Sequence, residues 1–333
     1  MSSKQFKAAL VGLGVISYNH LSALSTLDNV KVVALCDIKR ERAEERKKEF
    51  SLSDAKIYES YDEMLECEDL DTVHIMTPHY LHAEMAIKAL EKNVNVCLEK
   101  PICINCEQIS ALLEAEKKSS AKITVCFQNR FAPAFMMAKK LADEDGVVSA
   151  YFANFWERTA EYYTESGWRG SYLTEGGGAL INQAIHSIDH LISFMGKPKY
   201  VTATKSNHSL KGVIEVEDTA EGMIEFESGK FANFFATNAY HGYSTTNIFL
   251  ETENHKIEIR NLRLYIDGEP IREIEIPKVI GKAVYGDGHI TLITEFYRAL
   301  EFGGDMPVSL ESAQWALRVL LAAYKSNDKK TEI

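Results

Sequence analysis

Two kinds of hydrophobic patterning divide the chain at about residue 130. Before this point, short apolar runs such as KAALV at 7–11 and KVVALCD at 31–37 alternate with segments of helical periodicity. Uninterrupted apolar runs are typical of strands buried on both faces, and their alternation with helices predicts a parallel sheet covered by helices on each side. Further strands of this sheet are predicted at 72–78, 95–101 and 123–128.

Beyond residue 131, apolar and polar residues alternate with a period of two, with Gly, Asn and Asp at the turns. Single alternation indicates strands with one exposed face, so we expect a large, open and mostly antiparallel sheet. The strands are predicted at 148–158, 200–208, 213–226, 231–238, 246–251, 255–260 and 263–276, and the last two helices at about 288–303 and 309–326. The expected fold class is α/β, with a doubly wound parallel sheet in residues 1–130 and an α+β domain in residues 131–333.

Composition and charge exclude several classes of partner. A chain of 333 residues exceeds the size at which a single core keeps growing, which agrees with two domains. The net charge of -11 argues against a nucleic-acid partner, since phosphate surfaces require clustered Lys and Arg. No apolar stretch approaches the roughly 18 residues of a membrane span, and the start of the chain lacks the pattern of a signal peptide. We therefore expect a cytoplasmic protein without a membrane partner.

The six cysteines are expected to be reduced thiols, as is usual in the cytoplasm. Cys103 and Cys106 form a C-x-x-C pair, but a structural zinc site needs a second ligand pair at suitable spacing, and none follows. We expect both thiols to pack at a helix start, and we expect no bound metal.

A glycine motif follows the first predicted strand. Gly12 and Gly14 stand between KAALV and a helical segment, which is the context that a dinucleotide-binding turn requires. Gly12 would permit the tight turn, and Gly14 would let a pyrophosphate approach the backbone at the amino end of the helix. The third position of the motif is Ser17, whose small side chain still permits close packing of the helix.

An acidic residue ends the next strand. Asp37 lies 20 residues beyond Ser17, where a carboxylate can accept a hydrogen bond from a ribose 2′-OH, and this favours NAD. Arg40 could instead contact a 2′-phosphate, which leaves NADP as the alternative. Ligands of open parallel sheets bind beyond the carboxyl ends of the strands, so Thr77-Pro78 and Glu99-Lys100 are expected to converge on the same crevice.

The sequence resembles the Gfo/Idh/MocA family, which is named after glucose-fructose oxidoreductase, inositol dehydrogenase and a rhizopine catabolism protein. The resemblance extends over essentially the whole chain. The stretches that carry it are GLGVIS at 12–17, TPHYLHAEMAIKAL at 77–90, NVCLEKP at 95–101, GWRG at 167–170, GGGALINQAIHSIDH at 176–190 and YGDGHITLITEFYRAL at 285–300.

The resemblance implies an NAD(P)-binding Rossmann domain and a second domain for substrate binding and oligomerisation. It matches Lys100 to the family's catalytic lysine and His186 to its catalytic histidine, while Asn182 stands where many members carry an aspartate. The cofactor-binding residues expected are Gly12, Gly14, Val15, Ile16, Asp37, Ile38, Arg40, Thr77, Pro78, His79, His82, Glu99 and Lys100. The substrate-binding residues expected are Arg158, Tyr163, Trp168, Arg169, Asn182 and His186, with His289 as a further candidate for the pocket.

The implied reaction is hydride transfer between nicotinamide and a secondary hydroxyl of a sugar, cyclitol or sugar derivative. Its proton requires a group that titrates near neutral pH, which histidine supplies. Lys100 would stabilise the developing alkoxide, or would take the proton itself if burial lowered its pKa. Asn182 cannot support an imidazolium as a carboxylate does, so it would instead bind substrate hydroxyls beside His186, one helical turn away.

Other readings of the sequence remain. The family includes hydrolases that cleave glycosides through transient oxidation by tightly held NAD, and non-catalytic proteins that sense a dinucleotide.

The resemblance also implies a homodimer or homotetramer formed through the open face of the second sheet. Gly176, Gly177 and Gly178 are expected to omit side chains so that the backbone can turn beside the nicotinamide and the sugar.

Overall fold

The computed structural model describes residues 4–242, 244–272 and 288–333, which form two compact units. The first unit comprises residues 4–103, 107–128 and 288–312. The second comprises residues 104–106, 129–242, 244–272 and 313–333. The predicted division at residue 130 stays a prediction. In the structure, the segment 288–312, which the sequence analysis placed in the second domain, clusters with the first unit.

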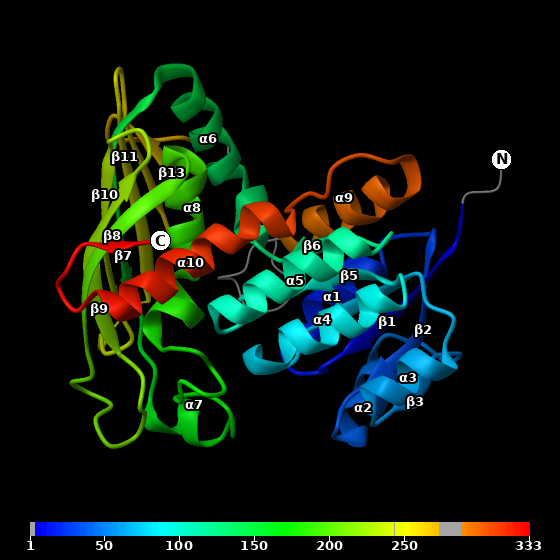
Figure 1. Ribbon diagram of the computed structural model, residues 1–333. Coiled ribbons are helices and arrows are strands. Elements are labelled where there is room, and N and C mark those ends of the chain that lie inside the picture. Colours follow the sequence, from blue (N-terminus) through cyan, green and yellow to red (C-terminus); the bar gives the residue numbers. More distant parts are fainter. Residues whose placement is uncertain (1–3, 243, 273–287) are drawn as a thin grey trace. The chain divides into compact units, whose positions relative to one another are not determined.

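The first unit is built on a six-stranded parallel sheet of order β3-β2-β1-β4-β5-β6 (Figure 1). Its strands are β1 (Phe6–Val11), β2 (Val30–Cys36), β3 (Lys56–Tyr58), β4 (Thr72–Ile75), β5 (Asn95–Leu98) and β6 (Ile123–Val125). The apolar runs form these strands because both faces are covered; in β1, Ala8, Ala9 and Leu10 are fully buried. The predicted doubly wound sheet is thereby confirmed, with the short edge strand β3 in addition.

Helices cover both faces of this sheet. They are α1 (Ser17–Leu24), α2 (Arg40–Glu49), α3 (Tyr61–Cys67), α4 (His82–Glu91), α5 (Cys106–Lys118) and α9 (Gly288–Phe302). The strand order runs from β1 to β3 in one direction and from β4 to β6 in the other. Because crossovers between parallel strands are right-handed, this reversal places α1 and α2 on one face and α4 and α5 on the other. The late helix α9 packs against α1, so this unit is completed by a segment distant in sequence.

The second unit carries a nine-stranded sheet of order β14-β13-β12-β11-β7-β10-β9-β8-β15 (Figure 1). Its strands are β7 (Val147–Phe155), β8 (Pro198–Ser206), β9 (Thr219–Phe226), β10 (Phe231–Thr237), β11 (Thr245–Thr252), β12 (Lys256–Arg260), β13 (Arg263–Ile266), β14 (Glu269–Pro270) and β15 (Thr331–Glu332). Neighbouring strands are antiparallel except β7 and β10, which pair in parallel. The mostly antiparallel sheet is confirmed; the part of the predicted strand 263–276 beyond residue 272 lies outside the described residues.

Among the described residues, helices cover one face of this sheet, and the other face carries exposed side chains. The remaining helices are α6 (Pro133–Asp145), α7 (Ala160–Thr164), α8 (Ile185–Met195) and α10 (Leu310–Ser326), whose first residues belong to the first unit. In β10, Ala232, Phe234 and Ala236 are buried, whereas Phe231 on the opposite side is half exposed. The open face also carries Tyr151 stacked on Phe249 with ring centroids 5.2 Å apart. Assembly through this face stays a prediction.

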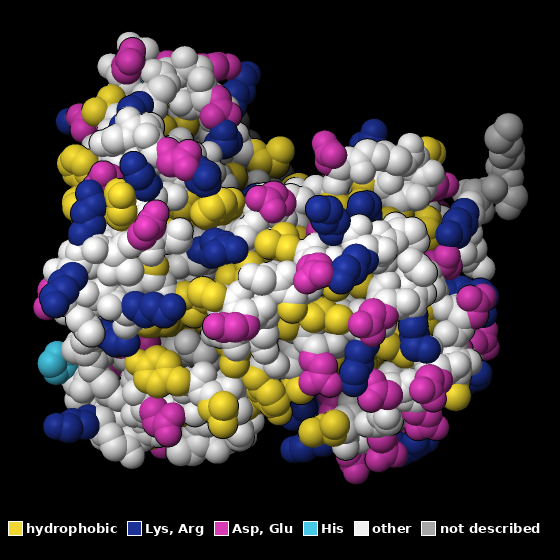
Figure 2. Space-filling model, viewed as in Figure 1, with side chains coloured by type: hydrophobic (Ala, Val, Ile, Leu, Met, Phe, Trp, Pro, Cys, Tyr) yellow, Lys and Arg dark blue, Asp and Glu magenta, His cyan; other side chains and the backbone are white. Residues whose placement is uncertain are grey.

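The surface carries both signs of charge. On the face drawn in Figure 2, acidic and basic side chains are interspersed over both units. Among the described residues, none of the helices combines the length and the apolar composition that crossing a bilayer would take. All six cysteines are free thiols.

Candidate functional site

The first cluster of predicted site residues follows the carboxyl end of β1. Gly12 has a φ of +83°, and a Cβ there would lie 2.7 Å from the backbone of Met76 and Thr77, so only glycine fits. A Cβ on Gly14 would meet nothing within 4 Å, which leaves this backbone open to a ligand. Ser17 begins α1 fully buried, and its hydroxyl donates to the Gly14 carbonyl at 2.7 Å, closing the turn.

Asp37 joins this turn from the end of β2. Its carboxylate accepts hydrogen bonds from the backbone N–H of Leu13 at 2.7 Å and of Lys39 at 2.8 Å. The cation beside Asp37 is Arg42, 3.8 Å away, a residue that sequence reasoning did not select. Arg40 forms ion pairs with Glu44 and Glu59 instead.

Two apolar side chains stand exposed beside the glycine turn. Val15 is 69% exposed and Ile38 is 83% exposed, while Ile16 is half-buried. Exposed branched apolar residues at a backbone turn with an open approach fit a surface that a bound ring system would cover. The turn, the Asp37 carboxylate and these side chains together suit an adenine dinucleotide.

The ends of β4 and β5 are tied together by His82. Its Nε2 lies 2.7 Å from the Thr77 carbonyl and its Nδ1 lies 2.6 Å from the Pro101 carbonyl. Burial lowers the pKa of His82, so the ring is neutral and donates to one carbonyl at a time. His79 is buried, with its ring centroid 5.9 Å from that of His82. His82 thus fixes the two strand ends that carry the predicted cofactor residues Thr77 and Lys100.

Glu99 lies behind Lys100 in a buried polar network that sequence reasoning missed. One oxygen of its carboxylate is 3.1 Å from Nε2 of His20 and 3.0 Å from Nε2 of His289, and the other accepts from the backbone N–H of Lys100 at 3.2 Å. The network continues from His20 to His74, whose Nδ1 atoms are 2.9 Å apart. From His74 it reaches the Tyr297 hydroxyl at 3.0 Å.

Charge within this network is concentrated on His20 and Glu99. Burial opposes both charges, but the contacts of His20 with Cys126 and Glu99 outweigh it and raise the pKa of His20 to about 9. Burial raises the pKa of the Cys126 thiol well above its usual range, so the negative charge facing His20 is that of Glu99. The two histidines hold the pKa of Glu99 well below its usual range, whereas burial lowers the pKa of His74 and of His289. An ion pair therefore supports the strand end from which Lys100 projects.

The three glycines of the second unit are crowded by the protein itself. A Cβ on Gly178 would lie 1.9 Å from the Glu217 carbonyl oxygen, and a Cβ on Gly177 would lie 2.0 Å from the Tyr324 hydroxyl. Gly176 has a φ of +87°, and its Cβ would meet the Ile104 side chain at 2.8 Å. Internal packing thus accounts for the absence of a side chain at each glycine, and the expectation that the backbone turns here beside the nicotinamide and the sugar stays a prediction.

The turn after the glycines is a π-helix, Leu180–Ala184, which passes directly into α8. The Glu217 carboxylate caps its start by accepting from the N–H groups of Gly178 at 2.9 Å and Leu180 at 3.0 Å. Asn182 lies in the π turn and His186 in the first turn of α8, and both are half-buried. Single π turns within helices occur frequently at functional sites.

Glu175 is the residue of this region that sequence reasoning missed. It is 1% exposed and accepts from the Gly170 N–H at 2.6 Å and from the Asn182 side-chain amide at 2.5 Å. Burial raises its pKa to about 7, in spite of these two hydrogen bonds and the charge of Arg169. The only local signal is its position directly before the glycines. A carboxyl group that titrates near neutrality therefore fixes the Asn182 side chain.

The ionisation of Glu175 should make the stability of the protein depend on pH. The pKa of Glu175 in the folded protein, about 7, exceeds the ordinary value of 4.5. Its contribution to the free energy of unfolding is therefore fully present below pH 4.5 and is lost as pH rises through 7. The loss is at most about 3 kcal/mol. We expect Glu175→Gln, which imitates the neutral acid, to unfold at a higher urea midpoint than the unmodified protein at pH 8.5 and at a similar midpoint at pH 5. The exposed Glu215→Gln serves as control. Equal pH dependence of Glu175→Gln and the unmodified protein would contradict the assignment.

Aromatic rings and arginines surround the π turn. Tyr163 is buried against Leu210, Ile214 and Val216, and its hydroxyl accepts from Asn238 at 3.0 Å. Its neighbour Tyr162 lies toward the site, with its hydroxyl 3.4 Å from the Asn182 amide nitrogen. The substrate contact predicted for Tyr163 stays untested, and the geometry favours Tyr162 as the tyrosine beside Asn182.

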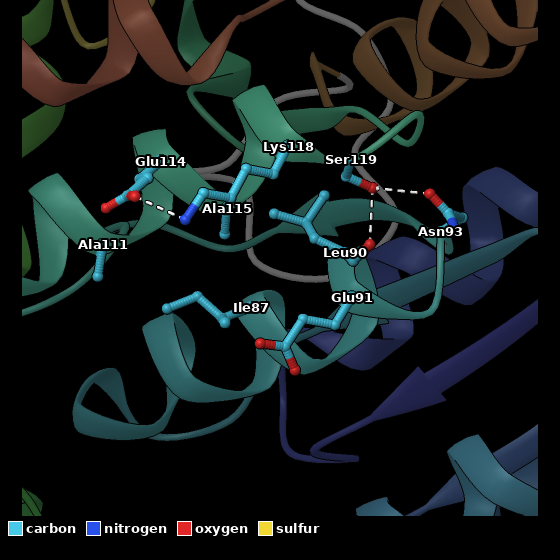
Figure 3. Close-up of a pocket in the computed structure, with 9 residues that line it drawn as sticks. All are labelled: Ile87, Leu90, Glu91, Asn93, Ala111, Glu114, Ala115, Lys118 and Ser119. Atoms are coloured by element: carbon cyan, nitrogen blue, oxygen red, sulfur yellow. Dashed lines mark hydrogen bonds and ion pairs between the residues drawn. The ribbon is translucent and has the colours of Figure 1, made fainter.

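The pocket drawn in Figure 3 lies between α4 and α5 of the first unit. Of its three charged side chains, Glu114 and Lys118 pair with each other and Glu91 is the third; the Ser119 hydroxyl bonds to the Leu90 carbonyl. Its lining residues are Ile87, Leu90, Glu91, Asn93, Ala111, Glu114, Ala115, Lys118 and Ser119. The predicted site residues lie elsewhere, so this groove is not the candidate site.

Comparison with known proteins decides the family. Residues 6–127 match the Gfo/Idh/MocA oxidoreductase family's NAD-binding Rossmann fold, and residues 146–333 match its C-terminal α/β domain. The chain belongs to the Gfo/Idh/MocA oxidoreductase family. The glycine turn and Asp37 thus lie in the family's NAD-binding domain.

Several curated relatives are named as dehydrogenases of cyclitols or sugars. The chain is similar to inositol 2-dehydrogenase of Salmonella typhimurium, with 32% identity over 139 residues, 41% of each protein. The match therefore spans about two fifths of the length of that relative. Glucose-6-phosphate 3-dehydrogenase of Bacillus subtilis is 25% identical over 288 residues, covering 82% of this chain and 80% of that protein.

The same fold is found among solved structures of the family. The WlbA dehydrogenase of Bordetella pertussis, solved in complex with NADH and UDP-GlcNAcA, matches with a TM-score of 0.88 at 24% identity over 100% of this chain and 99% of the other. This similarity shows the shared fold. Lys100 belongs to the first unit and His186 to the second, and their catalytic roles stay predictions.

Proposed function

We propose that this protein is an NAD-dependent dehydrogenase that acts on a secondary hydroxyl of a sugar, cyclitol or sugar derivative. One observation carries the proposal. The glycine turn after β1, Asp37 after β2, Thr77 after β4 and Lys100 after β5 all follow the carboxyl ends of parallel neighbouring strands, hence one edge of one sheet. Lys100, to which we assign a role in handling the proton, therefore follows a strand end at the edge where an open parallel sheet binds its dinucleotide.

NAD would be held by the backbone at Gly12 and Gly14, by Asp37 and by the exposed side chains of Val15 and Ile38. Bound there, its nicotinamide would supply the hydride acceptor for oxidation of the carbinol carbon. Lys100 stabilises the alkoxide that develops on the substrate oxygen, and His186 takes the proton near neutral pH. Asn182, oriented by Glu175, binds a neighbouring hydroxyl of the substrate.

The test is a panel of inositols, free sugars, sugar phosphates and nucleotide sugars, incubated with NAD or NADP and followed by absorbance of the reduced nicotinamide. We expect net NADH formation with at least one substrate, and a lower KM for NAD than for NADP. Sugar release from glycosides without net NADH would instead indicate the hydrolase. Tight NAD binding without any turnover would indicate the dinucleotide sensor.

A further inference from the structure

Two arginines of the second unit stack on one tyrosine ring. The Cζ atom of Arg158 lies 4.8 Å from the ring centroid of Tyr162, and that of Arg169 lies 4.4 Å from it. Each guanidinium is also held against a tryptophan, Arg158 on Trp156 at 4.6 Å and Arg169 on Trp168 at 4.8 Å. These distances are within the range of cation–π contacts, so both planar groups are fixed in place.

Neither arginine lies within 4.0 Å of a carboxylate in the part of the chain that the structure describes. The Nε atoms of both are buried and make no hydrogen bond among the described residues, while Nη1 of Arg158 donates to the Glu157 carbonyl at 2.8 Å. By contrast, the half-buried Arg46 and Arg130 each contact a carboxylate, Glu49 and Asp189 respectively. A buried donor without an acceptor is costly, and two such donors on neighbouring cations indicate a ligand.

Two acidic residues, Glu157 and Glu175, bear on the charge of the pair. The Glu157 carboxylate contacts His241 at 3.0 Å. Glu175 feels the charge of Arg169, but burial holds its pKa at about 7, so it carries less than a full negative charge at neutral pH. Within the part of the chain that the structure describes, neither acid forms an ion pair with the arginines.

The arginine pair is also connected to the candidate substrate residues. The Tyr162 hydroxyl, on the ring that carries both guanidinium groups, lies 3.4 Å from the amide nitrogen of Asn182. A group bound by the arginines would thus lie one side chain away from a residue assigned to a substrate hydroxyl. That spacing suits a substituent on the same small molecule.

We propose that Arg158 and Arg169 form an anion subsite and that the alcohol oxidised by this protein carries a carboxylate or a phosphate. Guanidinium groups bind both anions through paired N–H donors, and the stacked aromatic rings hold them ready to do so. The subsite selects charged sugar derivatives over neutral ones. Its assignment to the substrate, although not its affinity for anions, rests on the proposed function.

The two tryptophans in contact with the arginines allow the subsite to be tested without turnover. In a Trp315→Phe background, only Trp156 and Trp168 remain, and their fluorescence is titrated with inorganic phosphate and with acetate at constant ionic strength, against chloride. We expect saturable changes with phosphate, acetate or both, and the stronger of the two identifies the anion class. Arg158→Gln and Arg169→Gln should each raise the apparent Kd at least about tenfold.

The controls separate charge from packing. Arg318→Gln removes a half-buried arginine of the same unit that donates to Gln314 and whose tryptophan neighbour, Trp315, is already replaced in this background; it should leave the Kd for phosphate within about twofold. Arg158→Lys and Arg169→Lys keep the charge but lose the planar fork, and they should bind phosphate less tightly than the unmodified protein and more tightly than the Gln variants. An absence of any phosphate or acetate effect beyond that of chloride, or equal effects of Arg318→Gln and Arg158→Gln, would overturn the subsite.

Failure of this inference can be distinguished from failure of the proposed function. If phosphate binds through the arginines but no alcohol is oxidised, the dehydrogenase assignment falls and the subsite stands. If NADH forms equally well from glucose, glucose 6-phosphate and glucuronate, and neither phosphate nor acetate competes with them, the dehydrogenase stands and the subsite falls.

Discussion

Replacing Lys100 by alanine is expected to lower kcat by roughly 10² to 10⁴-fold, the usual contribution of a positioned proton-handling group. The loss should appear in kcat, because the ammonium group acts most strongly on charge that develops in the transition state. The Kd for NAD should change far less than kcat, since NAD is assigned mainly to the backbone at Gly12 and Gly14 and to Asp37, and Lys100 would supply only one further contact. The measurements are steady-state NADH formation with the substrate found in the panel, and equilibrium binding of NAD.

A matched control is available in the same unit. Lys92 is an exposed lysine just after α4, so Lys92→Ala removes an ammonium group without touching a strand end. It should leave both kcat and the Kd for NAD unchanged. Retention of full activity by Lys100→Ala would end the assignment, and an equal loss in Lys92→Ala would show a general effect of charge.

His186→Ala should lower kcat by a similar factor if it takes the proton from the alcohol that Lys100 stabilises. The effects of substitutions at residues that act together in one step are far from additive. The double variant should therefore lose little more kcat than the less active of the two single variants. A double loss equal to the product of the two single losses would mean that the residues act in separate steps. The kinetic comparison thus tests a cooperation that concerns residues of two different units.

The sheet of the first unit could be predicted because its strands are buried on both faces. Continuous apolar runs such as that of β1 are visible in sequence without knowledge of their partners. The edge strand β3 was missed since it has three residues, only one of them buried. In the second unit the strands could be located by alternation, but the parallel pairing of β7 and β10 could not, because periodicity does not encode which strand lies beside which.

In the candidate site, too, some contacts could be predicted from the sequence and others could not. The approach of Asp37 to the glycine turn follows from strand order alone and could be predicted. The contact of Glu99 with His20 and His289 joins residues 79 and 190 positions apart, and no local spacing points to it. The packing that crowds the glycines at 176–178 could not be predicted, because the partners, Tyr324 and Glu217, are distant in the chain.

Removing the Glu99 carboxylate should have the largest effect on stability. Glu99→Ala leaves the His20 imidazolium buried without its counter-charge, and breaking a buried pair in this way typically costs about 3–5 kcal/mol. We expect a correspondingly lower free energy of unfolding of the first unit in urea, measured by circular dichroism at pH 6. The exposed Glu114→Ala, which removes a carboxylate paired with Lys118 on α5, should leave the unfolding curve unchanged.

The loss should depend on pH in a defined direction. The lowered pKa of Glu99 gives stability that is present above pH 4.5 and lost as pH falls through its folded value. The raised pKa of His20 gives stability that is present below pH 6.5 and lost as pH rises through about 9. The pair therefore stabilises the fold most between these limits, and the difference between Glu99→Ala and the unmodified protein should shrink from pH 6 to pH 9.5.

A double-mutant cycle separates the ion pair from the packing around it. If the cost of Glu99→Ala is that of an unpaired imidazolium, then adding His20→Ala to the same chain removes this unpaired charge. The double variant should then lose about 1–3 kcal/mol less free energy of unfolding than the sum of the two single losses. If the cost comes from lost packing or from the bond of Glu99 to the Lys100 N–H, the two losses should add. Additive losses at pH 6, or a coupling that persists at pH 9.5, would therefore show that the strand end beneath Lys100 is held by something other than the charge on His20.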